Sequence, residues 1–159
     1  MNSQFQYASE QYEYVRSSRK VLLEFCAAIS SGDFIKEHSS FGRGSIRNLL
    51  VHIANVYENW IGKHGLARNI SFTTYQSVND IVSITGLFEA VDVLVYDFIR
   101  SIEDDAERKI EYELNGVKKS AGLLQVFSHT ITHEFHHKGQ VLSLGRHLGY
   151  IPVDTDIIR

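Results

Sequence analysis

The sequence predicts an all-α protein, a four-helix bundle with a small β-hairpin before the last helix. Three observations indicate this class. Four long segments carry apolar residues at the three- and four-residue spacing of a helix face. Glycines and short polar residues separate these segments, and one separator alternates with the two-residue period of strands. No repeat, linker or block of like charge divides the 159 residues, so residues 1–159 are expected to form a single domain.

The first two helices are expected on either side of a loop. Residues 4–30 contain no Gly or Pro, and their apolar side chains recur at helical spacing, which predicts one long amphipathic helix. Residues 31–44 are rich in glycine and short polar residues and are expected to form a loop. Ser45 can accept a hydrogen bond as an N-cap, so a second helix is expected from there to about Ile61.

The second half of the chain predicts two more helices and the hairpin. A periodic segment begins near residue 78 or 79 and is expected to end near residue 102. Residues 110–119 alternate around the Asn-Gly pair at 115–116, which is typical of a tight hairpin turn. A final helix is expected over residues 121–148, with Gly149 ending it.

Composition excludes several classes of function. Basic and acidic residues are interspersed and the net charge is −3, so we expect no nucleic-acid partner. No stretch approaches the roughly 20 apolar residues that cross a bilayer, and residues 1–6 lack a leader pattern, so we expect no membrane partner and a cytoplasmic protein. Cys26 is the single cysteine and lies among apolar residues, which predicts a buried structural thiol.

Histidines carry the main functional signal. Four of the eight fall within residues 129–137. His133 and His137 are four residues apart, so one helix face can present both rings to a single ion. A third ligand is needed, and His52, between apolar neighbours of the second helix, is the best candidate. Taken alone, His52 could instead be a hydrogen-bonded core residue. His129 could be a fourth ligand, a partner of a ligand or a packing residue.

A second motif overlaps the pair of histidines at residues 133 and 137. Residues 133–137 match H-E-x-x-H, in which the glutamate of a zinc protease activates water. No glutamate follows Glu134 as a third ligand, and no sheet is expected, so the protease interpretation is not favoured. Glu134 remains a candidate catalytic base or a residue that orients a ligand, with an exposed helix-surface carboxylate as the alternative.

Two segments, Ile46–Asn55 and Thr132–Gln140, together resemble the DinB superfamily, the DinB/YfiT-like metalloenzymes. The likeness includes the order of helices, the hairpin and the closing Leu-Gly, Pro and Asp residues. It implies His52, His133 and His137 as metal ligands, and a homodimer. Lys138 stands where the family often has Arg.

The resemblance also predicts roles for Gly139 and Gln140, which follow the ligands, and a type of chemistry for the site. Gly139 is expected to allow close helix approach and Gln140 to make a polar contact near the site, although both could merely pack. Characterised relatives include thiol-dependent enzymes, such as mycothiol-dependent maleylpyruvate isomerase and bacillithiol S-transferases.

The expected function is therefore that of a metal-dependent thiol-S-transferase. Its ion would lower the pKa of a bound thiol or water. Histidine nitrogens suit zinc or nickel, with iron, manganese and copper as alternatives. The expected partners are a small-molecule substrate and a low-molecular-weight thiol. Two other functions stay open: a metal-dependent hydrolase, and a non-catalytic stress-associated dimer in which the metal staples the helices together.

Overall fold

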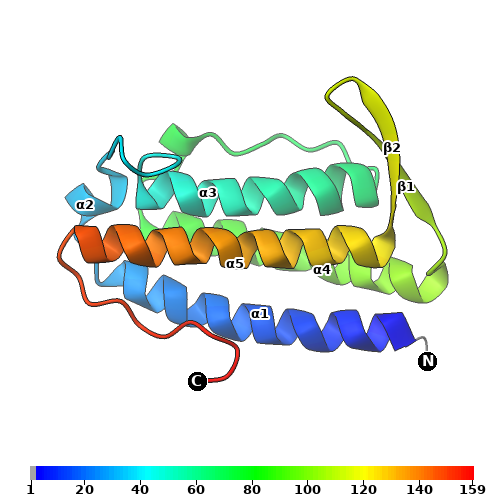
Figure 1. Ribbon diagram of the computed structural model, residues 1–159, viewed down its shortest axis with the longest axis horizontal. Helices are drawn as coiled ribbons and strands as arrows, with labels where there is room; N and C mark the ends of the chain where they lie inside the picture. Colours follow the sequence, from blue (N-terminus) through cyan, green and yellow to red (C-terminus); the bar gives the residue numbers. More distant parts are fainter. Residues whose placement is uncertain (1–2) are drawn as a thin grey trace.

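The computed structural model describes residues 3–159 and consists mainly of helices (Figure 1). The four long helical segments are α1 (Ser3–Ala27), α3 (Ile46–Tyr57) continued by the π-helical turns of η1 (Glu58–Gly65), α4 (Ile81–Asp104) and α5 (Leu123–His147). Helix α1 packs on α4 and α5, and α3 packs on the same two helices, so α1 and α3 lie diagonally across the bundle. The predicted all-α bundle with a hairpin is confirmed.

Local sequence signals set most helix ends. The Ser45 side chain accepts a hydrogen bond from the Asn48 backbone N–H and caps α3 as predicted. Asp80 caps α4 in the same way, so this helix begins at Ile81 and not at residue 78 or 79. Gly149 ends α5 with a φ of 94°, and the flanking backbone bonds form a Schellman motif.

The loop predicted after α1 contains a short helix, α2 (Ser31–Ile35). The Ser30 hydroxyl accepts a hydrogen bond from the Asp33 backbone N–H, and Phe34 is buried. Helix α1 therefore ends at Ala27, three residues earlier than expected. A single turn is too short to show helical periodicity in the sequence.

The hairpin joins α4 to α5 and projects from one end of the bundle (Figure 1). Strands β1 (Lys109–Leu114) and β2 (Val117–Gly122) pair antiparallel, with Asn115 and Gly116 at positive φ in the turn. Helix α5 begins at Leu123 and not at residue 121, because Ala121 pairs with Ile110.

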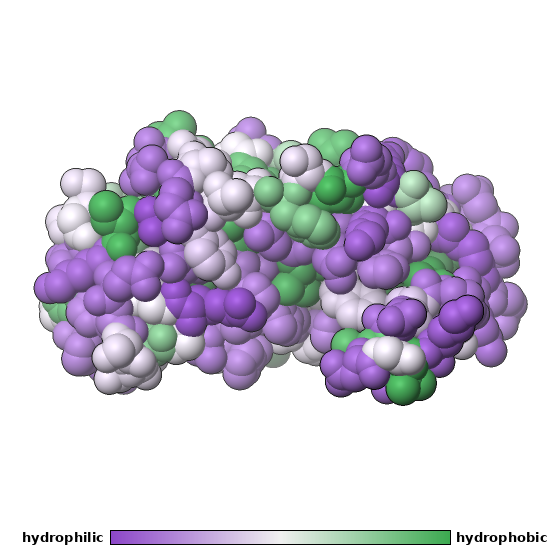
Figure 2. All heavy atoms as spheres, turned by 90° about the horizontal axis from the view of Figure 1, so that it is seen from above, coloured by the Kyte–Doolittle hydropathy of each residue, from purple (hydrophilic) through white to green (hydrophobic). Residues whose placement is uncertain are grey.

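Apolar side chains from the four long helices meet in one core, and Cys26 is buried there as predicted. Seen from above, the surface is mostly hydrophilic, with hydrophobic side chains in small separate groups (Figure 2). Within residues 3–159, none of the helices combines the length and apolar character that crossing a membrane requires. The last residues, after α5, run back along the bundle (Figure 1), where Ser18 of α1 donates a hydrogen bond to the Thr155 carbonyl.

Candidate metal centre

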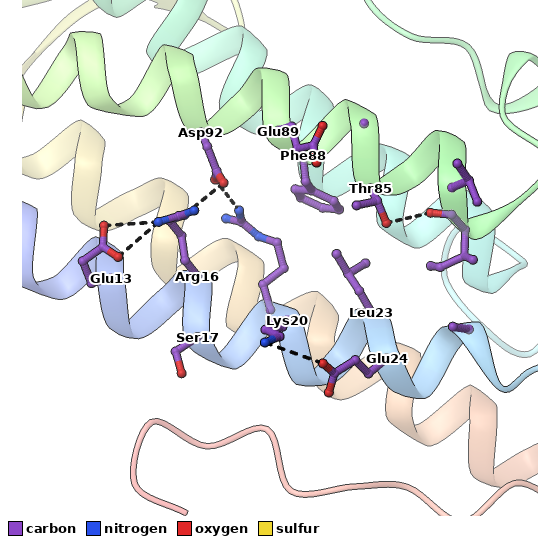
Figure 3. Close-up of a pocket in the computed structure, with 15 residues that line it drawn as sticks. Glu13, Arg16, Ser17, Lys20, Leu23, Glu24, Thr85, Phe88, Glu89 and Asp92 are labelled. Atoms are coloured by element: carbon purple, nitrogen blue, oxygen red, sulfur yellow. Dashed lines mark hydrogen bonds and ion pairs between the residues drawn. The ribbon is translucent and has the colours of Figure 1, made fainter.

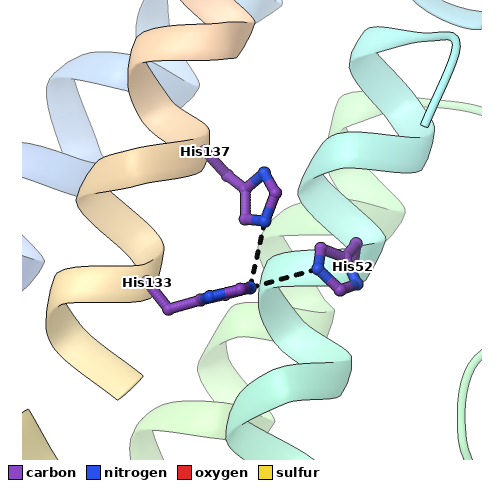
Figure 4. A group of neighbouring side chains, drawn as sticks. All are labelled: His52, His133 and His137. Carbon is purple, nitrogen blue, oxygen red and sulfur yellow. Dashed lines mark hydrogen bonds between the residues drawn. The ribbon is translucent and has the colours of Figure 1, made fainter. Parts of the chain in front are cut away.

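The three predicted histidines converge between α3 and α5 (Figure 4). His52 extends from α3, while His133 and His137 extend from successive turns of α5. The Nε2 atom of His133 lies 3.1 Å from Nε2 of His52 and 3.0 Å from Nε2 of His137. Residues 81 positions apart in sequence therefore present their ring nitrogens to one point.

This donor set fits a divalent cation. Nitrogens about 2.1 Å from one ion lie about 3.0 Å apart in octahedral geometry and about 3.4 Å apart in tetrahedral geometry, a range that includes the two spacings measured from His133. The ligand atoms of His52 and His137 also lie within 4.8 Å of one another. A neutral imidazole has one N–H, so His133 Nε2 can share a proton with only one of its two neighbours. A cation would satisfy all three lone pairs at once. That a metal binds here stays a prediction, which this geometry supports.

The electrostatics keep the rings neutral. Burial, then the positive charge of Arg43, lowers the pKa of His52 to about 4. Burial and the neighbouring His137 lower the pKa of His133 to about 4, and burial also lowers the pKa of His137. Neutral imidazole is the form that ligates metals. His137 Nδ1 contacts Gln140 Oε1 at 2.7 Å; donation along this contact leaves the His137 Nε2 lone pair directed at the site.

Arg43 places a cation beside the triad, and this residue was not predicted from the sequence. Its Nη2 lies 3.3 Å from His52 Nε2. The residue precedes α3 and has a φ of 66°, in the left-handed region. The Asn48 side chain donates a 2.8 Å hydrogen bond to the Arg43 carbonyl and so holds this backbone turn. A Gly-Arg-Gly sequence, residues 42–44, was the available signal.

Comparison with known proteins decides the family. The DinB family model matches residues 1–159. This chain belongs to the DinB family. It is also 28% identical over 155 residues to the uncharacterized protein YizA of Bacillus subtilis (strain 168), an alignment that covers 92% of this chain and 91% of YizA.

Glu134 is not the exposed carboxylate that was one interpretation of the sequence, because it is 1% exposed. Its carboxylate accepts hydrogen bonds from Arg19 Nε at 2.9 Å and Nη2 at 2.8 Å. It also accepts a 2.6 Å bond from the Tyr57 hydroxyl. Arg19 in turn bonds to Asp92 at 2.7 Å. Glu134 thus lies in a buried network that links α5 to α1, α3 and α4. These contacts favour a positioning role, and a role as catalytic base stays a prediction.

Lys138 is buried and lies against α1. Its ammonium donates to the Ser18 hydroxyl and lies 3.5 Å from the centre of the Phe135 ring. Burial lowers its pKa to about 8. Over residues 3–159, Ser18 is the one side chain to which this ammonium donates a hydrogen bond, and the contact connects α5 with α1.

Gly139 does not provide the close helix approach expected of it, because a Cβ added there would meet nothing within 4 Å. Gly145 is instead the glycine at a close approach of α5 to α1, since a Cβ added there would lie 2.7 Å from the Phe25 ring. Gln140 makes the predicted polar contact, with His137.

His129 lies one turn before His133 and is exposed. Its ring centre is 5.7 Å from that of His133, and it is not among the three residues whose ligand atoms converge. It instead packs edge-on against Trp60 at 5.3 Å, and Trp60 packs against Tyr112 of β1 at 5.0 Å. An aromatic wall therefore extends from the triad toward the hairpin.

A groove of about 870 Å³ lies between α1 and α4, away from the triad (Figure 3). Apolar residues such as Leu23 and Phe88 line it, and ion pairs join Asp92 to Arg16 and Arg19 at one end. None of the three histidines lines this groove.

Proposed function

We propose that this protein is a divalent-metal-dependent thiol-S-transferase: the thiolate of a small thiol forms a bond from its sulfur to an electrophilic carbon of a small-molecule substrate, and the leaving group of the substrate departs. The convergence of three Nε2 atoms from α3 and α5 carries the proposal. Three protein nitrogens are the ligand number of catalytic zinc sites, whereas structural sites use four. His52 and His133 are only partly buried, so a small molecule has access to the site. The resemblance to thiol-dependent enzymes of the DinB superfamily supports thiol chemistry over the alternatives.

The residues of this chain have distinct roles in the proposal. A divalent ion held by His52, His133 and His137 would supply Lewis acidity that lowers the pKa of a thiol or of water. Gln140 orients the His137 ring. The chain has a single cysteine, Cys26, which is buried, and burial raises its pKa to about 12. The reacting thiol therefore has to come from a separate small molecule.

The proposal is tested by thiol conjugation. Untagged protein is loaded with zinc or nickel and mixed with a fluorogenic bimane electrophile and, in turn, cysteine, glutathione and other small thiols. We expect metal-dependent conjugation with at least one thiol. His52→Asn should lose it, whereas His147→Asn, an exposed histidine at the far end of α5, should retain it.

Other outcomes would favour the remaining functions. Metal-dependent ester or amide hydrolysis without any thiol-dependent reaction would indicate a hydrolase. A metal that raises the melting temperature without any turnover would indicate a non-catalytic staple between α3 and α5. The expected homodimer stays a prediction, which the mass of the untagged protein in solution tests.

A further inference from the structure

Arg43, a cation that forms no ion pair within residues 3–159, lies beside the candidate metal centre. Arg43 Nη2 is 3.3 Å from His52 Nε2, the same nitrogen that faces His133. Over residues 3–159, the ion pairs join other cations to carboxylates, and none includes Arg43. A guanidinium so close to a site for a divalent ion opposes the binding of that ion, since like charges repel.

The position of Arg43 is fixed by buried structure. Its backbone has a φ of 66°, and Gly44 follows with a φ of 82°. Asn48 is 4% exposed and donates hydrogen bonds to the Arg43 carbonyl at 2.8 Å and to Glu37 Oε1 at 2.9 Å. Asn48 lies one helical turn before His52 on α3. The helix that carries a candidate ligand therefore also holds the strained turn that places the guanidinium.

Arg43 and a metal ion need the same lone pair. Arginine can only donate, so the His52 nitrogen is the acceptor in their contact. A ligating His52 has no lone pair left for Arg43, which then needs another acceptor. A carboxylate matches the guanidinium fork, and carboxylate oxygens also ligate zinc. A carboxylate taken up beside the ion would satisfy Arg43 and remove the repulsion between the two cations.

We propose that Arg43 is a specificity-determining residue that recruits a small carboxylate-bearing substrate to the metal centre, so that carboxylate and metal bind cooperatively. This inference rests on the proposed function and names its substrate class. The aromatic wall of Trp60, Tyr112 and His129 on the other side of His133 offers a flat apolar surface nearby, which makes benzoate a suitable probe.

The test is the affinity for zinc, measured by competition with a chromophoric chelator at constant ionic strength, with and without sodium benzoate. Three untagged proteins are compared: the wild type, Arg43→Gln and Arg146→Gln, an exposed arginine of α5 that serves as the charge-matched control. We expect benzoate to strengthen zinc binding by the wild type and by Arg146→Gln about fivefold or more, the lower end of measured couplings. Arg43→Gln should bind zinc more tightly than the wild type without benzoate and respond less than about twofold to it.

Each remaining outcome overturns the proposal. An equal benzoate response in the wild type and Arg43→Gln would mean that the carboxylate binds without Arg43. A wild type that binds zinc but ignores benzoate would exclude the cooperativity. Loss of zinc binding in Arg43→Gln alone would mean that Arg43 supports the site. Failure of all three proteins to bind zinc would refute the metal centre itself, a result distinct from the other three.

Discussion

The substitution Glu134→Gln tests whether this residue serves the fold or the chemistry. The carboxylate is buried and accepts two bonds from Arg19 and one from Tyr57. Removing its charge leaves the Arg19 guanidinium, 4% exposed, with Asp92 as its remaining ion-pair partner. Loss of one partner of a buried pair destabilises a protein by about 3–5 kcal/mol. For a chain of this length, this corresponds to a melting temperature about 6–20 °C lower.

The assay is denaturant unfolding of the metal-free protein at pH 7.5, followed by zinc titration of the folded variant. Domains of this kind have a free energy of unfolding of about 5–15 kcal/mol; from the middle of that range, about 10 kcal/mol, Glu134→Gln would keep about 5–7 kcal/mol and remain folded. We expect it to bind zinc as the wild type does, because its contacts point away from the triad. The control Glu89→Gln, an exposed carboxylate of α4, should change stability by less than about 0.5 kcal/mol.

A double-mutant cycle makes this prediction specific. Arg19→Met/Glu134→Leu removes both charges and should be less destabilised than the sum of its single variants, with a coupling of about 1–3 kcal/mol. Additive losses, or a Glu134→Gln variant as stable as the wild type, would refute the argument that this network is structural. Normal stability together with lost turnover would instead support Glu134 as a catalytic base.

Three further predictions follow from burial and packing. Gly145→Ala should destabilise the protein by about 1–3 kcal/mol, because the added Cβ would overlap the Phe25 ring. The matched Gly139→Ala should leave stability unchanged or raise it by up to about 1 kcal/mol. The urea midpoints of the two variants check both expectations. The pKa values of His52 and His133 are about 4 in the folded protein, against an ordinary 6.5. Between these two values the unfolded state binds more protons than the folded state, so metal-free protein should lose stability as the pH falls from about 6.5 to about 4. A His52→Asn/His133→Asn variant should lose less over that interval, and an equal loss would contradict the shifts. At about pH 8, iodoacetamide should label Cys26 far more slowly in the native protein than in the denatured protein. A pKa of about 12 in place of 9.0 lowers the thiolate fraction of Cys26 roughly 1,000-fold. Rapid labelling of the native protein would show that the thiol is accessible.

Periodicity was enough to predict the long helices and, together with the Asn-Gly pair, the hairpin, whereas the meeting of the three histidines also depended on the resemblance to the DinB family. The spacing of His133 and His137 is a local property of one helix, and a polar ring between apolar neighbours marked His52. The environment of Glu134 could not be predicted in this way. Helix α5 packs on both α1 and α3, so two of its faces are buried, and the Arg19 partner is 115 positions away.

The place of Arg43 beside His52 could not be predicted for a similar reason. An arginine between two glycines is typical of an exposed loop. Its direction depends on a left-handed turn that the Asn48 side chain holds through its hydrogen bond to the Arg43 carbonyl. Only the packed structure brings that turn against the end of the His52 ring.

The metal content of untagged protein tests the central claim most directly. Mass spectrometry should find about one divalent ion per chain in the wild type and in His147→Asn, and none in His133→Ala/His137→Ala, because two of three ligands are then lost. A wild type that contains no metal and takes up neither zinc nor nickel when they are added would contradict the account. The triad would then be a hydrogen-bonded histidine cluster within a structural bundle.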